Sequence, residues 1–280
     1  MQKKKLFASA MLLLATLLWG LSYSIQTISA ADIGTFTIVF FKGIGGILIF
    51  PLIMMRGEKI TKDTLKGGII IGCFAFLGCA LQQMGIENST VSKASFITVL
   101  YIIFVPLIES FTGKKIPAKI FISIGIALVG LYFLCMSRSF DLCIGDLYLL
   151  LCSICFALQI FFIDRFSQGN DALPLTFVAQ LTVSFLSLIV ALFKEPLDVN
   201  ALKNALLPIL FITLLGGLLA QCLQFIFQKD VGSTLASLLM SFESVFGALF
   251  GWLILNQTLN AREIFGCFLV FVAILIAESA

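Results

Sequence analysis

The stretch from Gly232 to Leu255 reads GSTLASLLMSFESVFGALFGWLIL and holds one charged residue, Glu243, at its centre. As a helix it would be roughly 36 Å long, enough to cross a bilayer with some tilt. A carboxylate at that depth costs about 2.5–3.5 kcal/mol, so it usually faces a bundle interior or a wet cavity. On a helical wheel Glu243 shares its face with Ala236, Met240 and Gly247, two of which are small, so that face has room for a partner helix or a solute. The alternative is a protonated Glu243 that only bonds a neighbouring helix.

The composition excludes an ordinary soluble domain. Apolar residues make up 60% of the 280 residues and charged residues 12%, whereas soluble domains average about half apolar and about a quarter charged. The net charge of +3 comes without a basic stripe, so no nucleic-acid partner is expected. There is no histidine, and Cys152-x-x-Cys155 has no second cysteine pair beside it. We therefore expect no metal site, no disulfide framework and no cofactor.

Apolar runs recur along the whole chain and predict an all-α membrane protein with ten transmembrane helices. Their approximate ranges are 6–28, 33–55, 66–86, 94–111, 117–136, 145–163, 172–193, 205–227, 232–255 and 261–278. The first run follows Lys3–Lys5 and could be a signal peptide cleaved near Ala30, but its length of about 20 residues favours an uncleaved helix. Pro106 is expected to kink the fourth run.

Basic residues in the connections predict the orientation. Of the 18 Lys and Arg residues, 12 fall in segments that are inside when the N-terminus is inside, and 5 fall in outer segments. The remaining one, Lys42, lies within a run. Because positive residues concentrate on the cytoplasmic side, we expect a multi-pass protein of the cell (cytoplasmic) membrane with both termini cytoplasmic.

The two halves of the chain resemble each other at an offset of 142 residues. Leu81–Gln82 falls on Leu223–Gln224, and Ala94–Ser95 falls on Ala236–Ser237. Five helices per half is an odd number, so the second copy must insert upside down. Inverted repeats are common in secondary transporters, with the site near the midplane at the repeat interface. The predicted five-helix repeats of this single membrane unit are residues 1–138 and 139–280.

Several short motifs together resemble the EamA-type drug/metabolite transporter superfamily. They are Leu18-Trp19-Gly20, Gln82 to Gly85, Ser89 to Phe96, Tyr101 through Pro106-Leu107, Ser241 to Val245, and Gly251-Trp252. The resemblance covers essentially the whole chain. Where members often carry Gly-Glu, this chain has Gly113-Lys114 and Asn256-Gln257, and Lys42 stands where many have Arg. The resemblance implies a ten-helix transporter of small metabolites that works by alternating access.

Lys42 and Glu243 are candidate partners. By helical rise, Lys42 lies roughly 13 Å and Glu243 roughly 18 Å from the outer ends of their helices. We expect the two charges to pair, directly or through a solute, because a lone charge in a membrane is costly. The alternative is that the Lys42 side chain extends to the outer interface.

Glutamines form a second group of candidates. Gln221, Gln224 and Gln228 recur at i, i+3 and i+7 on one helix face, and Gln82 is the repeat counterpart of Gln224. Amides suit a polar solute because they both donate and accept hydrogen bonds. Hydrogen bonding between helices is the alternative, and it applies equally to Gln159. Gln228, close to the cytoplasmic end, is expected at the membrane interface.

Aromatic side chains complete the candidate pathway. Trp19, Tyr23 and Tyr101 could stack on an apolar or aromatic part of a solute. Trp252 is better interpreted as an interface anchor. Glu109, close to two lysines, indicates either an inner gate or plain interfacial solvation.

The sequence therefore predicts a secondary transporter of small metabolites, with amino acids or related solutes as the leading class. Its partners are the solute and the lipid bilayer, and Glu243 is the candidate for coupling to protons. The absence of histidine and of paired catalytic carboxylates disfavours an intramembrane enzyme. The five-plus-five repeat disfavours a receptor or structural membrane protein. The direction of transport, the coupling ion and the oligomeric state stay open.

Overall fold

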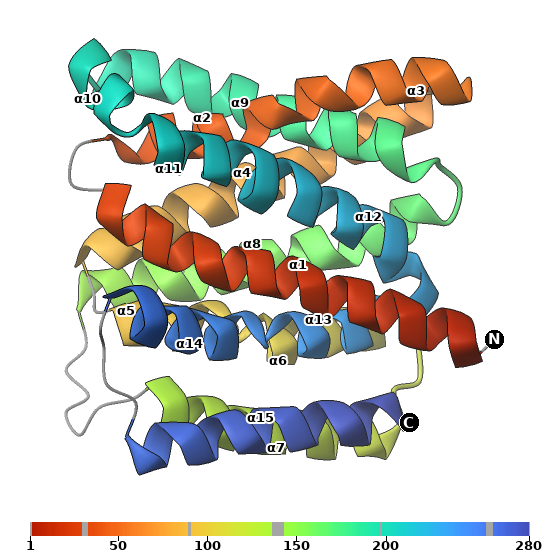
Figure 1. The fold of residues 1–280 in the computed structure, drawn as a ribbon. Coiled ribbons are helices and arrows are strands. Elements are labelled where there is room, and N and C mark those ends of the chain that lie inside the picture. Colours follow the sequence, from red (N-terminus) through yellow and green to blue (C-terminus); the bar gives the residue numbers. More distant parts are fainter. Residues whose placement is uncertain are drawn as a thin grey trace.

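The computed structural model describes residues 2–29, 33–88, 91–135, 143–196, 198–255 and 260–279, and within these ranges every regular element is a helix (Figure 1). The α-helices are α1 (Gln2–Ser29), α2 (Thr35–Ile44), α3 (Phe50–Arg56), α4 (Lys62–Asn88), α5 (Val91–Thr98), α6 (Tyr101–Phe111), α7 (Ala118–Cys135), α8 (Ile144–Ser167), α9 (Ala172–Lys194), α10 (Val199–Asn204), α11 (Leu206–Phe211), α12 (Ala220–Val231), α13 (Ser233–Met240), α14 (Glu243–Leu255) and α15 (Ala261–Glu278). A 3-10 segment, η1 (Gly45–Ile49), joins α2 to α3, and a π-helical segment, η2 (Ile212–Leu219), joins α11 to α12. The predicted all-α class is confirmed.

Nine spans within the described ranges are long and apolar enough to cross a membrane, and they match the first nine predicted runs. They are Lys3–Gln26, Thr35–Arg56, Lys62–Asn88, Ala94–Phe111, Ala118–Cys135, Ile144–Ser167, Ala172–Lys194, Leu206–Val231 and Ser233–Ile254. Helix α15 has the bounds of the tenth run, but its 18 residues include Arg262, Glu263 and Glu278. A tenth crossing therefore stays a prediction.

The span around Glu243 is interrupted, so the expectation of one continuous helix there is wrong. It forms α13 and α14, with a break at Ser241 and Phe242. The Phe242 amide donates to the carbonyl three residues back at 3.2 Å, and the Ser241 amide is shared between the carbonyls of Ser237 at 3.0 Å and Leu238 at 3.2 Å. The Ser241 hydroxyl also donates to the Leu238 carbonyl at 2.7 Å, competing with the backbone as serine hydroxyls do. Glu243 is consequently the first residue of a helix, and a single helical wheel does not describe its surroundings.

The fourth span breaks at the equivalent position. Helix α5 ends at Thr98 and α6 begins at Tyr101, which is 142 residues before Glu243. Pro106, expected to kink this span, lies inside α6, and the interruption comes before it. At the interruption, the Leu100 amide donates to the carbonyl three residues back, at 3.2 Å, and not to the one four residues back as in an α-helix.

Element bounds and packing both repeat between the two halves of the chain. Helices α8, α13 and α14 begin 142 residues after α1, α5 and α6. Helix α4 packs on α8, and its counterpart α12 packs on α1. Helix α6 likewise packs on α8, and α14 packs on α1. The equivalent pairs α2–α9 and α7–α15 pack on each other. Each of these contacts of a first-half helix with the second half therefore has a counterpart in which the two halves change roles. A pseudo-twofold axis between the halves would produce this pattern.

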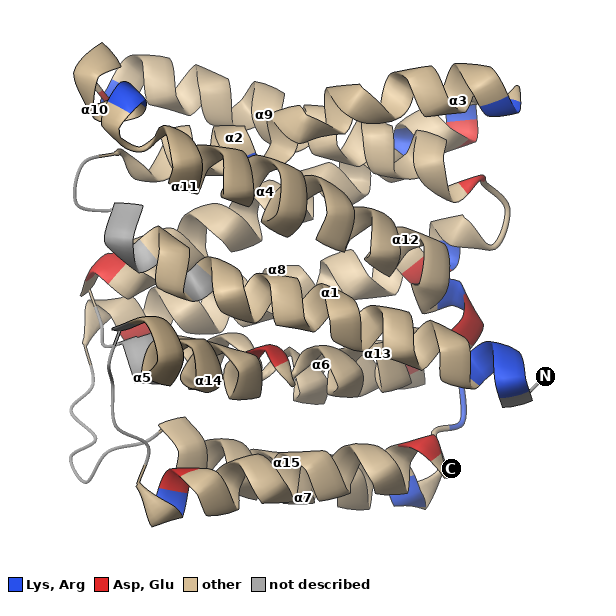
Figure 2. Cartoon of the chain, in the orientation of Figure 1, with Lys and Arg blue, Asp and Glu red and all other residues tan. Residues whose placement is uncertain are grey.

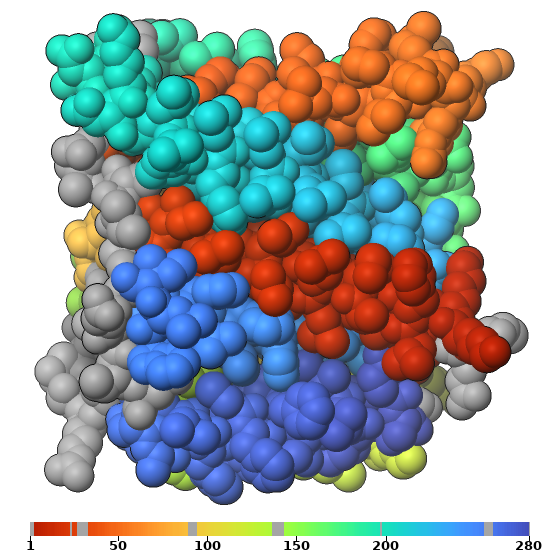
Figure 3. All heavy atoms as spheres, in the orientation of Figure 1, coloured from red at the N-terminus to blue at the C-terminus, as the bar shows by residue number. Residues whose placement is uncertain are grey.

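Both chain ends lie at the same end of the bundle (Figure 1). We call this end, which carries Gln2 and Ser279, the terminal face, and the other end the opposite face. Figure 2 shows Lys and Arg residues gathered along the terminal face. There, Lys4 lies 2.9 Å from Asp230, which ties α1 to α12. In the space-filling view, α1, the α11–α12 span and the α13–α14 span form a continuous surface (Figure 3).

Close contact between α7 and α15 generates a stability prediction. A Cβ atom at Gly266 would lie 2.5 Å from the Gly130 carbonyl oxygen and 2.6 Å from the Leu134 amide nitrogen. Backbone atoms cannot move aside cheaply, so we expect Gly266→Ala to lower the melting temperature of the purified protein. Gly125→Ala is the matched control on α7, because a Cβ there meets no heavy atom within 4 Å. The control should be neutral or stabilise by about 0.5–1 kcal/mol; equal melting temperatures for the two variants would contradict this packing.

Candidate functional site

A cavity lies between the two halves of the chain, with an empty volume of about 810 Å³ that includes a part open to solvent. Eight of the nine predicted pathway residues line it: Trp19, Lys42, Gln82, Tyr101, Gln159, Gln221, Gln224 and Glu243. The ninth is Tyr23, whose side chain lies outside the described part of the chain. Residues chosen for polarity in apolar runs thus converge on one space, which we call the central cavity.

Four further polar or thiol side chains line the central cavity without having been predicted, namely Ser22, Gln26, Cys79 and Gln180. Ser22 and Gln26 follow Trp19 at i+3 and i+7, so helical spacing from the tryptophan could have identified them. Gln180 is a single amide in an apolar run, and only the packing of α9 against α2 brings it to the cavity.

Glu243 and Tyr101 meet at the centre of the site. The Tyr101 hydroxyl donates to Glu243 Oε1 at 3.3 Å, and the two residues are 3% and 7% exposed, Tyr101 being the lower. They are repeat counterparts, and each begins the second helix of a broken span. The first turn of a helix has unsatisfied N–H groups and a partial positive charge, which favours a carboxylate there. The break before α14 therefore supplies an environment in which an intramembrane carboxyl group is tolerated.

Lys42 approaches the central cavity from the other side. It lies in the last turn of α2, just before the 3-10 segment, and its side chain is half-buried. Lys42 and Glu243 line the same space, but the ion pairs formed by the described residues do not include a direct contact between them. A direct Lys42–Glu243 pair, one form of the expected pairing, is therefore not present in this conformation.

The π-helical segment exposes backbone carbonyls to the site. Gly216 and Gly217 line the central cavity, and π-helical turns are often found at functional sites. Trp19 Nε1 donates to the Gly216 carbonyl and Gln180 Nε2 to the Gly217 carbonyl, each at 3.0 Å. The equivalent residues of the first half lie within the regular helix α4. This irregular wall therefore belongs to the second half alone.

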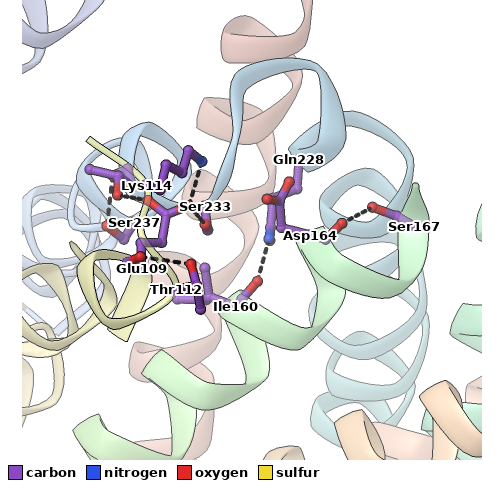
Figure 4. Close-up of polar contacts among 10 residues, drawn as sticks. Glu109, Thr112, Lys114, Ile160, Asp164, Ser167, Gln228, Ser233 and Ser237 are labelled. Carbon is purple, nitrogen blue, oxygen red and sulfur yellow. Dashed lines mark hydrogen bonds and ion pairs between the residues drawn. The ribbon is translucent and has the colours of Figure 1, made fainter. Parts of the chain in front are cut away.

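Gln228 lies inside the helix bundle, three residues before the end of α12, and its expected place at the membrane interface stays a prediction. Its side chain is fully buried, because α12 packs against α8 and the Gln228 amide donates to the Ile160 carbonyl at 2.6 Å (Figure 4). Gln224 donates to Gln228 Oε1 at 3.0 Å. The glutamine face of α12 thus supplies a hydrogen bond between helices at Gln228, while Gln224 and Gln221 reach the central cavity.

A polar cluster joins α6 to α13 close to the terminal face. Glu109, only 2% exposed, accepts hydrogen bonds from Ser233 at 2.5 Å, from Thr234 and from Lys114 (Figure 4). We call these four residues the terminal latch. Ser233 of the latch begins α13, and Met240, seven residues later on the same helix, lines the central cavity. The terminal latch therefore lies on the terminal-face side of that cavity.

Comparison with known proteins identifies the family. The sequence profile of the EamA-like transporter family matches residues 6–136 and again residues 143–278. The chain belongs to the EamA-like transporter family. This EamA-like protein is therefore a multi-pass membrane transporter of the drug/metabolite transporter superfamily, in a family whose members are not enzymes.

One sequence relative agrees with this assignment, and one solved structure shares the fold. An Archaeoglobus fulgidus protein described as an uncharacterized transporter is 29% identical over 280 residues, covering 98% of the EamA-like chain and 87% of the relative. A protein of known crystal structure superimposes with a TM-score of 0.83 at 17% identity, over 96% of this chain and 97% of that one. The second match shows that the fold is shared.

Proposed function

We propose that this chain is a secondary transporter of a small polar metabolite and that the central cavity is its solute-binding site. The observation that carries the proposal is that one carboxyl group, one lysine and a set of glutamine amides line a single cavity between two repeated halves. Charged side chains inside a membrane bundle usually mark a transport pathway. Intermediate depth in the bundle and a position at the repeat interface are typical of transporter sites.

The chemistry of the lining favours amino acids or related solutes. An ammonium group could bind Glu243 beside the Tyr101 hydroxyl, and a carboxylate could bind Lys42. Because these two charged side chains share the cavity without a direct ion pair, a zwitterionic solute can complete the electrostatic balance. The ring of Trp19 offers an apolar wall for the rest of the solute.

The mechanism that we propose is alternating access between two inverted five-helix repeats. Equivalent helices of the two halves make equivalent contacts, which supports the repeat. An odd number of crossings per half would invert the second copy. Clustering of Lys and Arg at the terminal face supports a cytoplasmic location for both termini (Figure 2). In this arrangement α15 is the tenth crossing and the membrane is the cell membrane.

The terminal latch is proposed as the inner gate. Its bonds close the bundle between the central cavity and the terminal face. On the other side the cavity reaches Gln26, three residues before the end of α1 at the opposite face. This favours a conformation in which solute reaches the site from the opposite face, and the latch must open for exchange with the terminal side.

Transport measurements test the proposed site. We expect uptake into proteoliposomes of at least one class in a panel of amino acids, purines, vitamins and cationic drugs. Glu243→Gln keeps the size of the side chain but removes its charge, so it should lower the rate by about tenfold or more. A dependence on an imposed pH gradient that disappears in the same variant would support proton coupling at Glu243.

Glu58→Gln is the matched control, since Glu58 lies between α3 and α4, does not line the central cavity, and forms an ion pair with Arg56 at 3.8 Å. It should transport like the unmodified protein. Unchanged transport in a folded Glu243→Gln protein would contradict the proposed role of the central carboxyl group.

Thiol labelling tests the gate. In a variant that keeps Cys79 as its sole cysteine, a membrane-impermeant maleimide added from the terminal side should label this cavity-lining thiol slowly. Glu109→Gln removes the charge that holds Lys114 and weakens the bonds to Ser233 and Thr234, so labelling from that side should increase severalfold. The Glu58→Gln control should leave the rate unchanged. Equal labelling in the Glu109→Gln variant would show that the terminal latch does not control access.

A further inference from the structure

A second pocket opens at the terminal face and is separate from the central cavity. Its empty volume is about 510 Å³, again counting a part open to solvent. Lys5 of α1 and Lys114 and Lys115 of the α6–α7 connection form its basic part. Its apolar part is made of Ile116, Pro117, Ile120, Val231, Leu235 and Ala277. We call it the terminal pocket.

The terminal pocket carries excess positive charge. Its three lysines face one lining carboxylate, Glu109, and that group already accepts hydrogen bonds from Ser233, Thr234 and Lys114. Lys5 has only weak partners, since its Nζ lies 3.4 Å from the Glu278 carbonyl oxygen and 3.9 Å from Glu278 Oε2. Lys115 is exposed and forms no ion pair with a described residue. Lys115 is therefore available to an anion, and Lys5 can reach one by giving up its long contacts with Glu278.

The apolar part distinguishes the possible anions. A free phosphate ion would leave the isoleucine, proline and leucine surfaces of the pocket uncovered. A phospholipid would cover them with its glycerol backbone and first acyl carbons while its phosphate reaches the lysines. The pocket also lies where α6 ends and α7 begins, between two spans long and apolar enough to cross a membrane, Ala94–Phe111 and Ala118–Cys135. Basic pockets between transmembrane helices are known to hold anionic headgroups.

We infer that the terminal pocket binds the phosphate group of an anionic phospholipid, with Lys5 and Lys115 as its principal contacts. The bound lipid joins the start of α1 to the α6–α7 connection, two segments far apart in the sequence. Its phosphate lies beside Lys114, which is half-exposed even when paired with Glu109. This binding site goes beyond the proposed transport function and holds whichever solute the central cavity takes.

Thermal unfolding of the full chain in detergent tests the site. Added phosphatidylglycerol should raise the melting temperature in a concentration-dependent way, because a ligand that binds only the folded state stabilises it. Phosphatidylcholine, which has no net charge, should give a much smaller shift. Inorganic phosphate should give none. In the Lys5→Gln/Lys115→Gln double variant we expect the phosphatidylglycerol shift to fall by at least about half.

The control is Lys59→Gln/Lys66→Gln, which removes the same charge from exposed lysines at the terminal face outside the pocket. It should keep the full shift. Native mass spectrometry of the single Lys115→Gln variant, an exposed change that should not affect folding, should show fewer bound phosphatidylglycerol molecules.

Three results would overturn the inference. One is an undiminished phosphatidylglycerol shift in the Lys5→Gln/Lys115→Gln protein. Another is an equal shift with phosphatidylcholine. The third is an equal shift with inorganic phosphate, which would identify a free anion and not a lipid as the ligand.

Discussion

The hydrogen bond between Tyr101 and Glu243 is the contact on which the central part of the molecule depends. A carboxyl group inside a membrane bundle needs a polar partner or a wet cavity, and Glu243 has both. The partner is its own repeat counterpart from the other half of the chain. Each residue begins a helix at a break in its span, and the two side chains meet where the two halves of the chain face each other. The central cavity lies beside this contact, and Tyr101, Met240 and Glu243 are the residues of the two interrupted spans that line it.

The two halves differ in ways that give the molecule a direction. Glu109 accepts hydrogen bonds from Ser233 and Thr234 on the terminal-face side of the cavity, whereas the residue 142 positions later is Gly251, which has no side chain to form such a latch. Likewise the second half carries the π-helical wall at Gly216 and Gly217, and the first half has a regular helix there. In the mechanism that we propose, these departures from the repeat distinguish the latched terminal side from the side on which the cavity reaches Gln26.

Much of this arrangement could be predicted from the sequence. Hydrophobic runs gave accurate bounds where a helix is continuous, as for 172–193 against Ala172–Lys194, because a membrane span is recognisable by length and polarity alone. Polar residues inside those runs predicted the lining of the central cavity, because a polar side chain within a membrane span usually faces the bundle interior. The break at Ser241 and Phe242 was missed because both flanking segments are apolar and no glycine or proline marks the junction. The bond from Gln228 to a backbone carbonyl could not be foreseen either, since every residue has a carbonyl and only tertiary packing selects Ile160.

Binding of solute at the central cavity is the claim most directly open to measurement. The chain has two tryptophans, so Trp252→Phe leaves Trp19, a cavity-lining residue, as the sole reporter. Titrating a transported solute should change Trp19 fluorescence saturably, and adding Glu243→Gln should raise the half-saturating concentration by about tenfold or more. A transported solute that leaves Trp19 emission unchanged, or that binds equally well without the Glu243 charge, would contradict the assignment of this cavity as the binding site.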